Sequence, residues 1–146
     1  MDVFSLGIAG LVMLWVKEPP IVRDIEPVAP THVLVVPRAH HVDIAQLYDG
    51  FSFNCLSWIE ALGFCGIGEA KDFLDGGHNI ARDGVLPLNT HGGQLSHGRT
   101  HGMGLLREAI VQLRGDAGER QVSGAKVGVV SSGGLTPSGV ILLRAE

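Results

Sequence analysis

The sequence predicts an α/β domain in which helices are layered on a mixed sheet. Two observations support this prediction. Segments with helical periodicity alternate with short, continuous apolar segments, a pattern typical of strands buried in a sheet. The chain has 146 residues, of which 45% are hydrophobic and 18% charged. Such a chain is long and apolar enough to fold around a hydrophobic core, and it is unlike a disordered segment.

The first elements are predicted from an apolar run and a group of prolines. Residues 3–16 are apolar, but this run is shorter than the ~20 residues that cross a bilayer. Asp2 stands where a signal peptide carries a basic residue, so we expect a buried segment and no membrane span. After a proline-rich stretch, residues 31–38 (THVLVVPR) form a predicted strand that ends at Pro37.

The helices of the middle region follow from apolar stripes and glycine stops. A helix is predicted over residues 51–64, capped by Asp49 or Ser52. Its apolar stripe comprises Phe51, Cys55, Trp58, Ile59 and Leu62. Residues 66–77 predict a short helix that ends at Gly76 and Gly77, and residues 84–89 a short extended segment.

The C-terminal third has the clearest periodicity. Residues 104–118 predict an amphipathic helix with Leu105, Ile110 and Leu113 on its apolar side and Gly115 as its stop. Two apolar strands are predicted next, over residues 125–132 and 139–145. The glycine- and proline-containing turn 133–138 joins them.

Charge and cysteine content exclude some classes of protein. The formal net charge is −4, and no clustered basic face points to a nucleic-acid partner. Cys55 and Cys65 lie ten positions apart in an otherwise apolar segment. We interpret them as reduced, buried thiols of a cytoplasmic protein.

The stretch PLNTHGGQLSHGRTHGMG, residues 87–104, concentrates histidine and glycine. His91, His97 and His101 are spaced by six and four residues, and no Glu follows a histidine as in the His-Glu-x-x-His zinc motif. The stretch also lacks the glycine and lysine pattern of a phosphate-binding loop. We therefore expect neither a metal nor a cofactor here. A catalytic loop whose glycines allow close backbone approach is the third possibility.

Longer stretches of the sequence carry a family resemblance. These are DIAQLYDGFSFNCLSWIEALGFCGIGE (43–69), LPLNTHGGQLSHGRTHGMGLLREAIVQLRGDAGERQV (86–122), AKVGVVSSGG (125–134) and GVILLRA (139–145). Together they resemble the C-terminal region of the thiolase superfamily, in the lipid-transfer-protein branch related to the sterol-carrier-protein thiolases. The resemblance covers about residues 42–146 and implies a partial thiolase-like C-terminal domain.

That resemblance implies work on acyl-CoA thioesters. It places Asn89, Gly92, Gly93 and Arg99 in substrate binding, and Tyr48, His91 and His101 in catalysis.

The chain departs from the family at three motifs. Tyr48-Asp49-Gly50-Phe51 replaces His-Asp-Cys-Phe, and Gly98-Arg99-Thr100 replaces Gly-His-Pro. Residues 131–134 contain no Cys or His. These departures favour the branch members that cleave aldol adducts of steroid CoA esters with a tyrosine acid/base. The second tyrosine expected near Arg99 is absent.

The resemblance also predicts a partner. No stretch resembles the thiolase half that carries the nucleophilic cysteine, so we expect a homo- or hetero-oligomer, with an OB-fold chain of the DUF35 type as one candidate. A non-catalytic accessory subunit is the alternative within this family.

The segment 1–42 resembles another family. RDIEPVAPTHVLVVPRAHHVDI (23–44) is similar to the first half of a histidine-triad nucleotide hydrolase, without the triad itself. This resemblance leaves a nucleotide binder that holds AMP through 31–41 as a further alternative. The boundary near residue 42 fits a natural fusion, a truncated gene or a recombined sequence.

Overall fold

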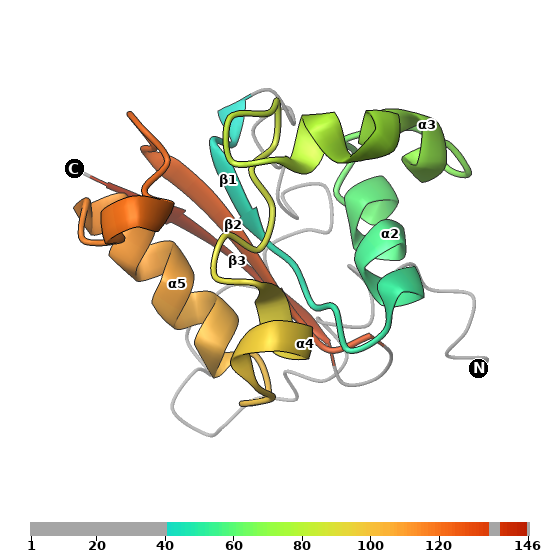
Figure 1. Cartoon of the computed structure of the whole chain (residues 1–146). Helices are drawn as coiled ribbons and strands as arrows, with labels where there is room; N and C mark the ends of the chain where they lie inside the picture. The colour runs from blue at the N-terminus through green and yellow to red at the C-terminus, as the bar shows by residue number, and fades with distance from the viewer. Residues whose placement is uncertain (1–40, 135–137, 146) are drawn as a thin grey trace, which may run out of the picture.

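The computed structural model describes residues 41–134 and 138–145, and these residues form a layered α/β fold. A sheet lies between one long helix and a second layer of shorter helices (Figure 1). The predicted fold class, helices layered on a mixed sheet, is therefore confirmed. The segments predicted over 3–16 and 31–38, and the histidine-triad-like residues up to 40, lie outside the described residues.

Among the described residues, the sheet has three strands in the order β1-β2-β3. Strand β1 (Ile44–Gln46) runs parallel to β2 (Val127–Ser132), and β3 (Gly139–Arg144) runs antiparallel to β2. The two strands predicted at the C-terminal end are thus confirmed within two residues. Strand β1 was not predicted, because three residues are too few to show a period of two.

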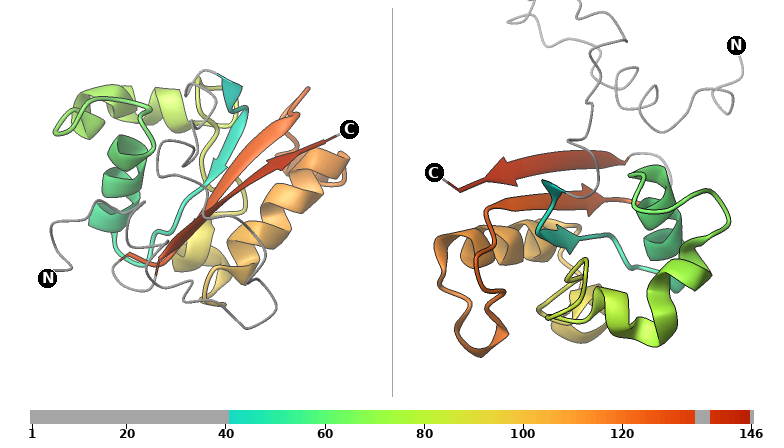
Figure 2. Two further views of the ribbon diagram at one scale, coloured as in Figure 1. Left: turned by 180° about the vertical axis from the view of Figure 1, so that it is seen from behind. Right: turned by 90° about the horizontal axis from the view of Figure 1, so that it is seen from above.

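The two faces of the sheet are covered by different helices (Figure 2). Ala45, Leu47 and Val129 pack with Trp58 and Ile59 of helix α2 (Ser52–Ala61). On the opposite face, Val130 packs with Leu105 and Ala109 of helix α5 (Met103–Arg114). Neighbouring strand residues point to opposite faces, and β1 and the middle of β2 are buried on both faces, whereas β3 is only partly buried.

Helix α2 is shorter than predicted. It begins at Ser52 and ends at Ala61, with Phe51 as its N-cap residue. Phe51 is 74% exposed, so its assignment to the buried stripe was wrong. No side chain caps the helix, so the predicted cap by Asp49 or Ser52 was also wrong.

The remaining helices partly match the predictions. Helix α3 (Ala70–Leu74) ends at Asp75, which takes a left-handed backbone with φ 46°, so the glycine stop was placed too late. A 3-10 segment, η4 (Asp75–Ile80), follows. Gly115, with φ 81°, ends α5 as predicted.

Two short helical segments were not predicted. They are α4 (Gly93–His97), inside the histidine- and glycine-rich stretch, and η5 (Gly118–Arg120). Across the described ranges 41–134 and 138–145, no helix has the length and apolar character needed to cross a bilayer.

Candidate active site

The candidate site lies at the carboxyl ends of β1 and β2. Because these strands are parallel, their carboxyl ends meet at one edge of the sheet, where ligands of open α/β sheets commonly bind. Helix α4 and the beginning of α5 lie at the same edge (Figure 1). Residues 47–49 leave β1 there, next to the turn 89–93.

Asn89 fastens the turn 89–93 to the end of β1. Its side-chain oxygen accepts a hydrogen bond from the Leu47 backbone N–H at 2.7 Å, and its side-chain nitrogen donates to the Leu47 carbonyl at 2.9 Å. Its own N–H donates to Ala45 at 2.9 Å. Asn89 has a left-handed φ of 47°, which Asn tolerates better than most residues. Asn89 thus has a structural role, and its role in substrate binding stays a prediction.

Gly92 and Gly93 allow a buried carboxylate to approach the turn. Both have positive φ, 95° and 66°. A Cβ on Gly93 would lie 1.8 Å from Oδ2 of Asp49, which is 8% exposed. The other oxygen, Oδ1, accepts the Gln94 N–H at 2.9 Å. Asp49 thus caps α4, and not the helix for which the sequence suggested it.

His91 is half-buried in this turn. Its ring centroid lies 5.0 Å from that of the exposed His97. Burial lowers the pKa of His91 below its usual range, and the charges of His97 and Arg120 act in the same direction, while Glu108 and Asp49 oppose them. The imidazole is therefore neutral at neutral pH, which is the form that accepts a proton.

Tyr48 follows β1 and lies half-buried between the two faces of the core. Its backbone N–H donates to Oγ of Ser131, at the end of β2, at 2.9 Å. Its side chain packs against both the α2-side and the α5-side cluster. The hydroxyl lies over Gly50, where an added Cβ would be only 2.5 Å away, and it has no hydrogen-bond partner among the described residues.

Arg99 and His101 lie in the connection between α4 and α5. Both are exposed, and their side chains form no hydrogen bond or ion pair within the described part of the chain. His101 has φ 49°, and its carbonyl accepts a bond from Oγ of Ser132 at 3.4 Å. The structure thus joins Asn89, His91 and the two glycines in one turn, and leaves Arg99 and His101 on the neighbouring exposed loop.

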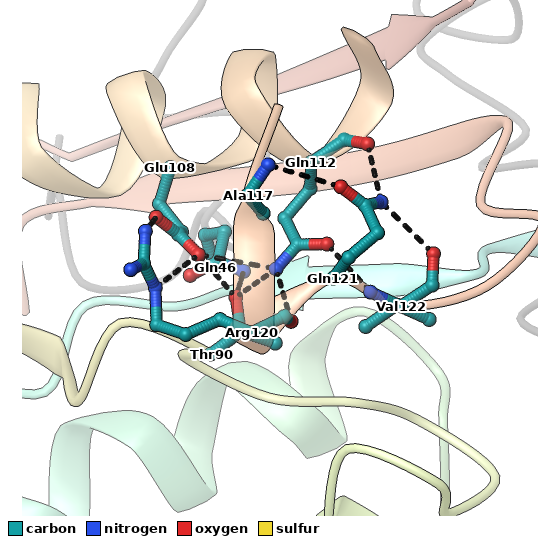
Figure 3. Close-up of polar contacts among 8 residues, drawn as sticks. All are labelled: Gln46, Thr90, Glu108, Gln112, Ala117, Arg120, Gln121 and Val122. Carbon is teal, nitrogen blue, oxygen red and sulfur yellow. Dashed lines mark hydrogen bonds and ion pairs between the residues drawn. The ribbon is translucent and has the colours of Figure 1, made fainter. Parts of the chain in front are cut away.

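A buried polar network beneath the turn was not predicted (Figure 3). Glu108 of α5 is 1% exposed and accepts bonds from Thr90 at 2.8 Å and from Nη2 of Arg120 at 3.0 Å. Gln112 donates to Glu108 at 3.1 Å and to Thr90 at 3.0 Å, and Gln46 of β1 donates to Thr90 at 3.1 Å.

The sequence contained a signal for this network. The buried residues of α5 are Leu105, Glu108, Ala109 and Gln112, which follow the i, i+3, i+4, i+7 spacing of one helix face. The predicted stripe instead joined Leu105 to Ile110 and Leu113, both only half-buried. The burial of a charged residue on this face was not predicted, because it requires partners that only the fold supplies.

Several buried polar atoms near the turn lack a hydrogen-bond partner among the described residues. They are Oε1 of Gln46, Nδ1 of His91 and both amide atoms of Gln94. An unsatisfied buried polar group costs about 1–3 kcal/mol. In native proteins such an atom calls for an explanation, such as a bound water or ion, strain, or a role in catalysis.

The two cysteines are free and only partly buried, so the prediction of buried thiols was too strong. Burial, with a smaller effect from Asp49, raises the pKa of Cys55 to about 12, and burial also raises the pKa of Cys65. Neither is an activated nucleophile. No cluster of three potential metal ligands occurs within 41–134 and 138–145.

Fold and site together define a thiolase-like C-terminal domain. The model of the family described as "Thiolase C-terminal domain-like" matches residues 37–143, and the chain belongs to this family. The assigned boundary near residue 42 stays a prediction.

Similar proteins come from bacteria and vertebrates. The chain is 47% identical over 102 residues to a "17-hydroxy-3-oxo-4-pregnene-20-carboxyl-CoA lyase" of Mycobacterium tuberculosis, a match that covers 69% of this chain and 26% of the relative. It is 43% identical over 101 residues to a "Steroid side-chain-cleaving aldolase" of Thermomonospora curvata, with 69% and 26% covered. It is 38% identical over 109 residues to "Sterol carrier protein 2" of Oryctolagus cuniculus, with 73% and 20% covered.

A solved structure has a similar fold. The "Ltp2-ChsH2(DUF35) aldolase" superposes with a TM-score of 0.68 at 40% sequence identity, over 75% of this chain and 28% of that chain. The chain thus spans about a quarter of the length of the relatives it matches.

Proposed function

We propose that this chain provides the C-terminal part of a lipid-transfer-type, thiolase-like site that acts on CoA thioesters. The favoured reaction is retro-aldol cleavage of a carbon–carbon bond, with acyl transfer as the other chemistry of this superfamily. The observation that carries the proposal is the 47% and 43% identity to relatives whose names denote a steroid carboxyl-CoA lyase and a steroid side-chain-cleaving aldolase.

Retro-aldol cleavage requires a proton acceptor and a group that stabilises negative charge. In a retro-aldol cleavage, a base removes the proton of the β-hydroxyl group and the Cα–Cβ bond breaks. Its electron pair moves to the thioester carbonyl, and the resulting enolate takes a proton at Cα. We assign proton transfer to Tyr48, whose hydroxyl has no competing partner among the described residues, with His91 or His101 relaying the proton.

Substrate contacts are assigned to the turn and the adjacent loop. Backbone at Gly92 can approach a thioester closely, because Gly92 is exposed and carries no Cβ. The space beside Gly93 is filled by Asp49, so we assign Gly93 a role through the shape of the turn. Asn89 holds this turn in place. Arg99 is an exposed cation with no ion pair in the described ranges, and it is suited to an anionic group of CoA.

The proposal includes a partner chain. The similar solved structure is named as an aldolase of Ltp2 with a DUF35 chain, and we infer a DUF35-type partner with an OB fold for this protein too. Assembly with such a chain and a cytoplasmic location remain predictions.

Ligand-dependent thermal unfolding tests the binding part of the proposal. The purified chain is heated with CoA, a steroid CoA thioester, a fatty acyl-CoA or AMP, alone and with a DUF35-type chain. Binding to the folded state adds about 2.7 kcal/mol at a hundredfold excess over Kd, so a CoA thioester should raise the Tm. Stabilisation by AMP alone would instead favour the histidine-triad-like alternative.

Replacement of Tyr48 by Phe tests the catalytic part. With the partner chain present, Tyr48→Phe should lower turnover of a β-hydroxyacyl-CoA by about 10²–10⁴-fold, because it removes the acid/base hydroxyl. CoA-dependent stabilisation should persist, since the ring and its packing remain. Unchanged turnover would remove Tyr48 from the mechanism.

A further inference from the structure

The polar network beneath the turn contains a charged side chain that the proposed reaction does not use. Glu108 is 1% exposed, on the face of α5 that packs against the sheet. Removing a carboxylate from water is costly, so its retention requires strong partners. The Glu108 carboxylate accepts four hydrogen bonds. Two come from Thr90 and Gln112, and two come from Nε and Nη2 of Arg120 at 3.3 and 3.0 Å.

Thr90 connects this carboxylate to the candidate site. Its hydroxyl donates to Glu108 at 2.8 Å and accepts from Gln46 at 3.1 Å and from Gln112 at 3.0 Å. A hydroxyl has one donor and two acceptor positions, so all three are occupied. Thr90 stands between Asn89 and His91, and one side chain therefore links β1, α5 and the catalytic turn (Figure 3).

We propose that Glu108 is the positioning residue for His91: its buried carboxylate holds Thr90, and with it the turn that carries His91, against α5. Arg120 has 46% of its side chain exposed and neutralises this carboxylate from the η5 side. The inference builds on the proposed function, in which His91 relays a proton. It adds two residues, Glu108 and Thr90, that act through His91 and do not touch substrate.

The charges that face His91 give the proposal a measurable signature. They are Glu108 from α5, His97 from α4, Asp49 after β1 and Arg120 from η5. The Glu108 charge opposes the lowering of the His91 pKa by burial. Loss of that charge should therefore lower the His91 pKa further. If Glu108 only anchored Arg120, loss of the Thr90 hydroxyl would leave the His91 ring in its wild-type position.

Nuclear magnetic resonance titration of the histidine rings in the full chain tests this directly. Glu108→Gln keeps the side-chain shape and an acceptor for Thr90 while it removes the charge. The His91 resonance, assigned with His91→Gln, should titrate at a lower pH than in the wild type. Glu119→Gln, which removes an exposed acid from η5, is the matched control and should leave the titration unchanged.

Two further variants keep the test decisive if Glu108→Gln does not fold. Thr90→Val removes the linking hydroxyl, and the His91 ring should lose its single well-defined resonance; Thr90→Ser should restore it. Arg120→Gln removes a cation and should raise the His91 pKa.

The proposal is overturned if folded Thr90→Val keeps the wild-type His91 resonance and titration, because the turn would then not depend on the contact with Glu108. If Thr90→Val does not fold, wild-type His91 titration in both Glu108→Gln and Arg120→Gln overturns it. These outcomes do not depend on turnover. Failure of the chain to bind CoA thioesters would instead count against the proposed function.

Discussion

At the scale of single residues, Gly93 is the glycine of the turn 89–93 with the least room for a side chain. The carboxylate of Asp49 occupies the space that a Cβ on Gly93 would need. It caps the N–H of Gln94 from there. Gly93 is thus required for two reasons, its φ of 66° and this contact with Asp49. Neither reason was predicted from the sequence.

Gly93→Ala should destabilise the protein more than Gly63→Ala does. Both glycines have positive φ, so both substitutions carry a backbone cost of about 1–2 kcal/mol. Only Gly93 adds a clash, worth about 1–3 kcal/mol more, since Gly63 has no atom within 4 Å of its added Cβ. Urea unfolding of both variants measures the difference. Equal losses would show that Asp49 moves aside without cost.

At the scale of elements, the shortest strand is held by a side chain from outside the sheet. Strand β1 has three residues, and the chain beyond it is fixed by the Asn89 amide on the backbone of Leu47. Leu47 is fully buried, so its backbone groups need these partners. The turn and the strand therefore form one structural unit.

Substitutions at Asn89 separate its contacts from its backbone conformation. Asn89→Gly keeps the left-handed φ and loses both bonds to Leu47, for an expected loss of about 1–3 kcal/mol. Asn89→Ala adds strain of about 1–2 kcal/mol. Chemical unfolding should rank the wild type above Gly and Gly above Ala. A glycine variant as stable as the wild type would mean that the amide contributes nothing to β1.

At the scale of the whole molecule, the site lies where parallel strands end between two helical layers. The α5 layer brings a buried acid, Glu108, and the turn brings a half-buried base, His91. Both have folded-state pKa values below their usual ranges. Burial is the main cause of the lowered His91 pKa. Burial by itself would raise the Glu108 pKa, but the hydrogen bonds from Arg120, Thr90 and Gln112 and the charge of Arg120 together outweigh it.

Stability should therefore fall with acid in two stages. The unfolded chain binds a proton at His91 more readily than the folded chain, so stability declines as pH falls below about 6.5, the ordinary histidine value. The contribution of Glu108 is present above the ordinary glutamate value of about 4.3 and is lost as pH falls through its lower folded-state pKa. Urea unfolding at a series of pH values measures both stages. His91→Gln should flatten the first stage only, and an unchanged slope in that variant would contradict the assignment.

The sequence by itself determined the fold class, the two C-terminal strands, the glycine that ends α5 and the family of the chain. These depend on local patterns: continuous apolar runs, helical spacing and motif residues in a fixed order. It also singled out the histidine- and glycine-rich stretch 87–104, which contains the turn 89–93.

Only the tertiary structure decided which groups meet. Asp49 caps α4 and not α2, Glu108 is buried beneath Thr90, and Phe51 is exposed although it fits the α2 stripe. The reason is physical: a buried charge is stable only when partners distant in sequence satisfy it, and residues 49 and 94, or 90 and 108, come together only through strand pairing and helix packing.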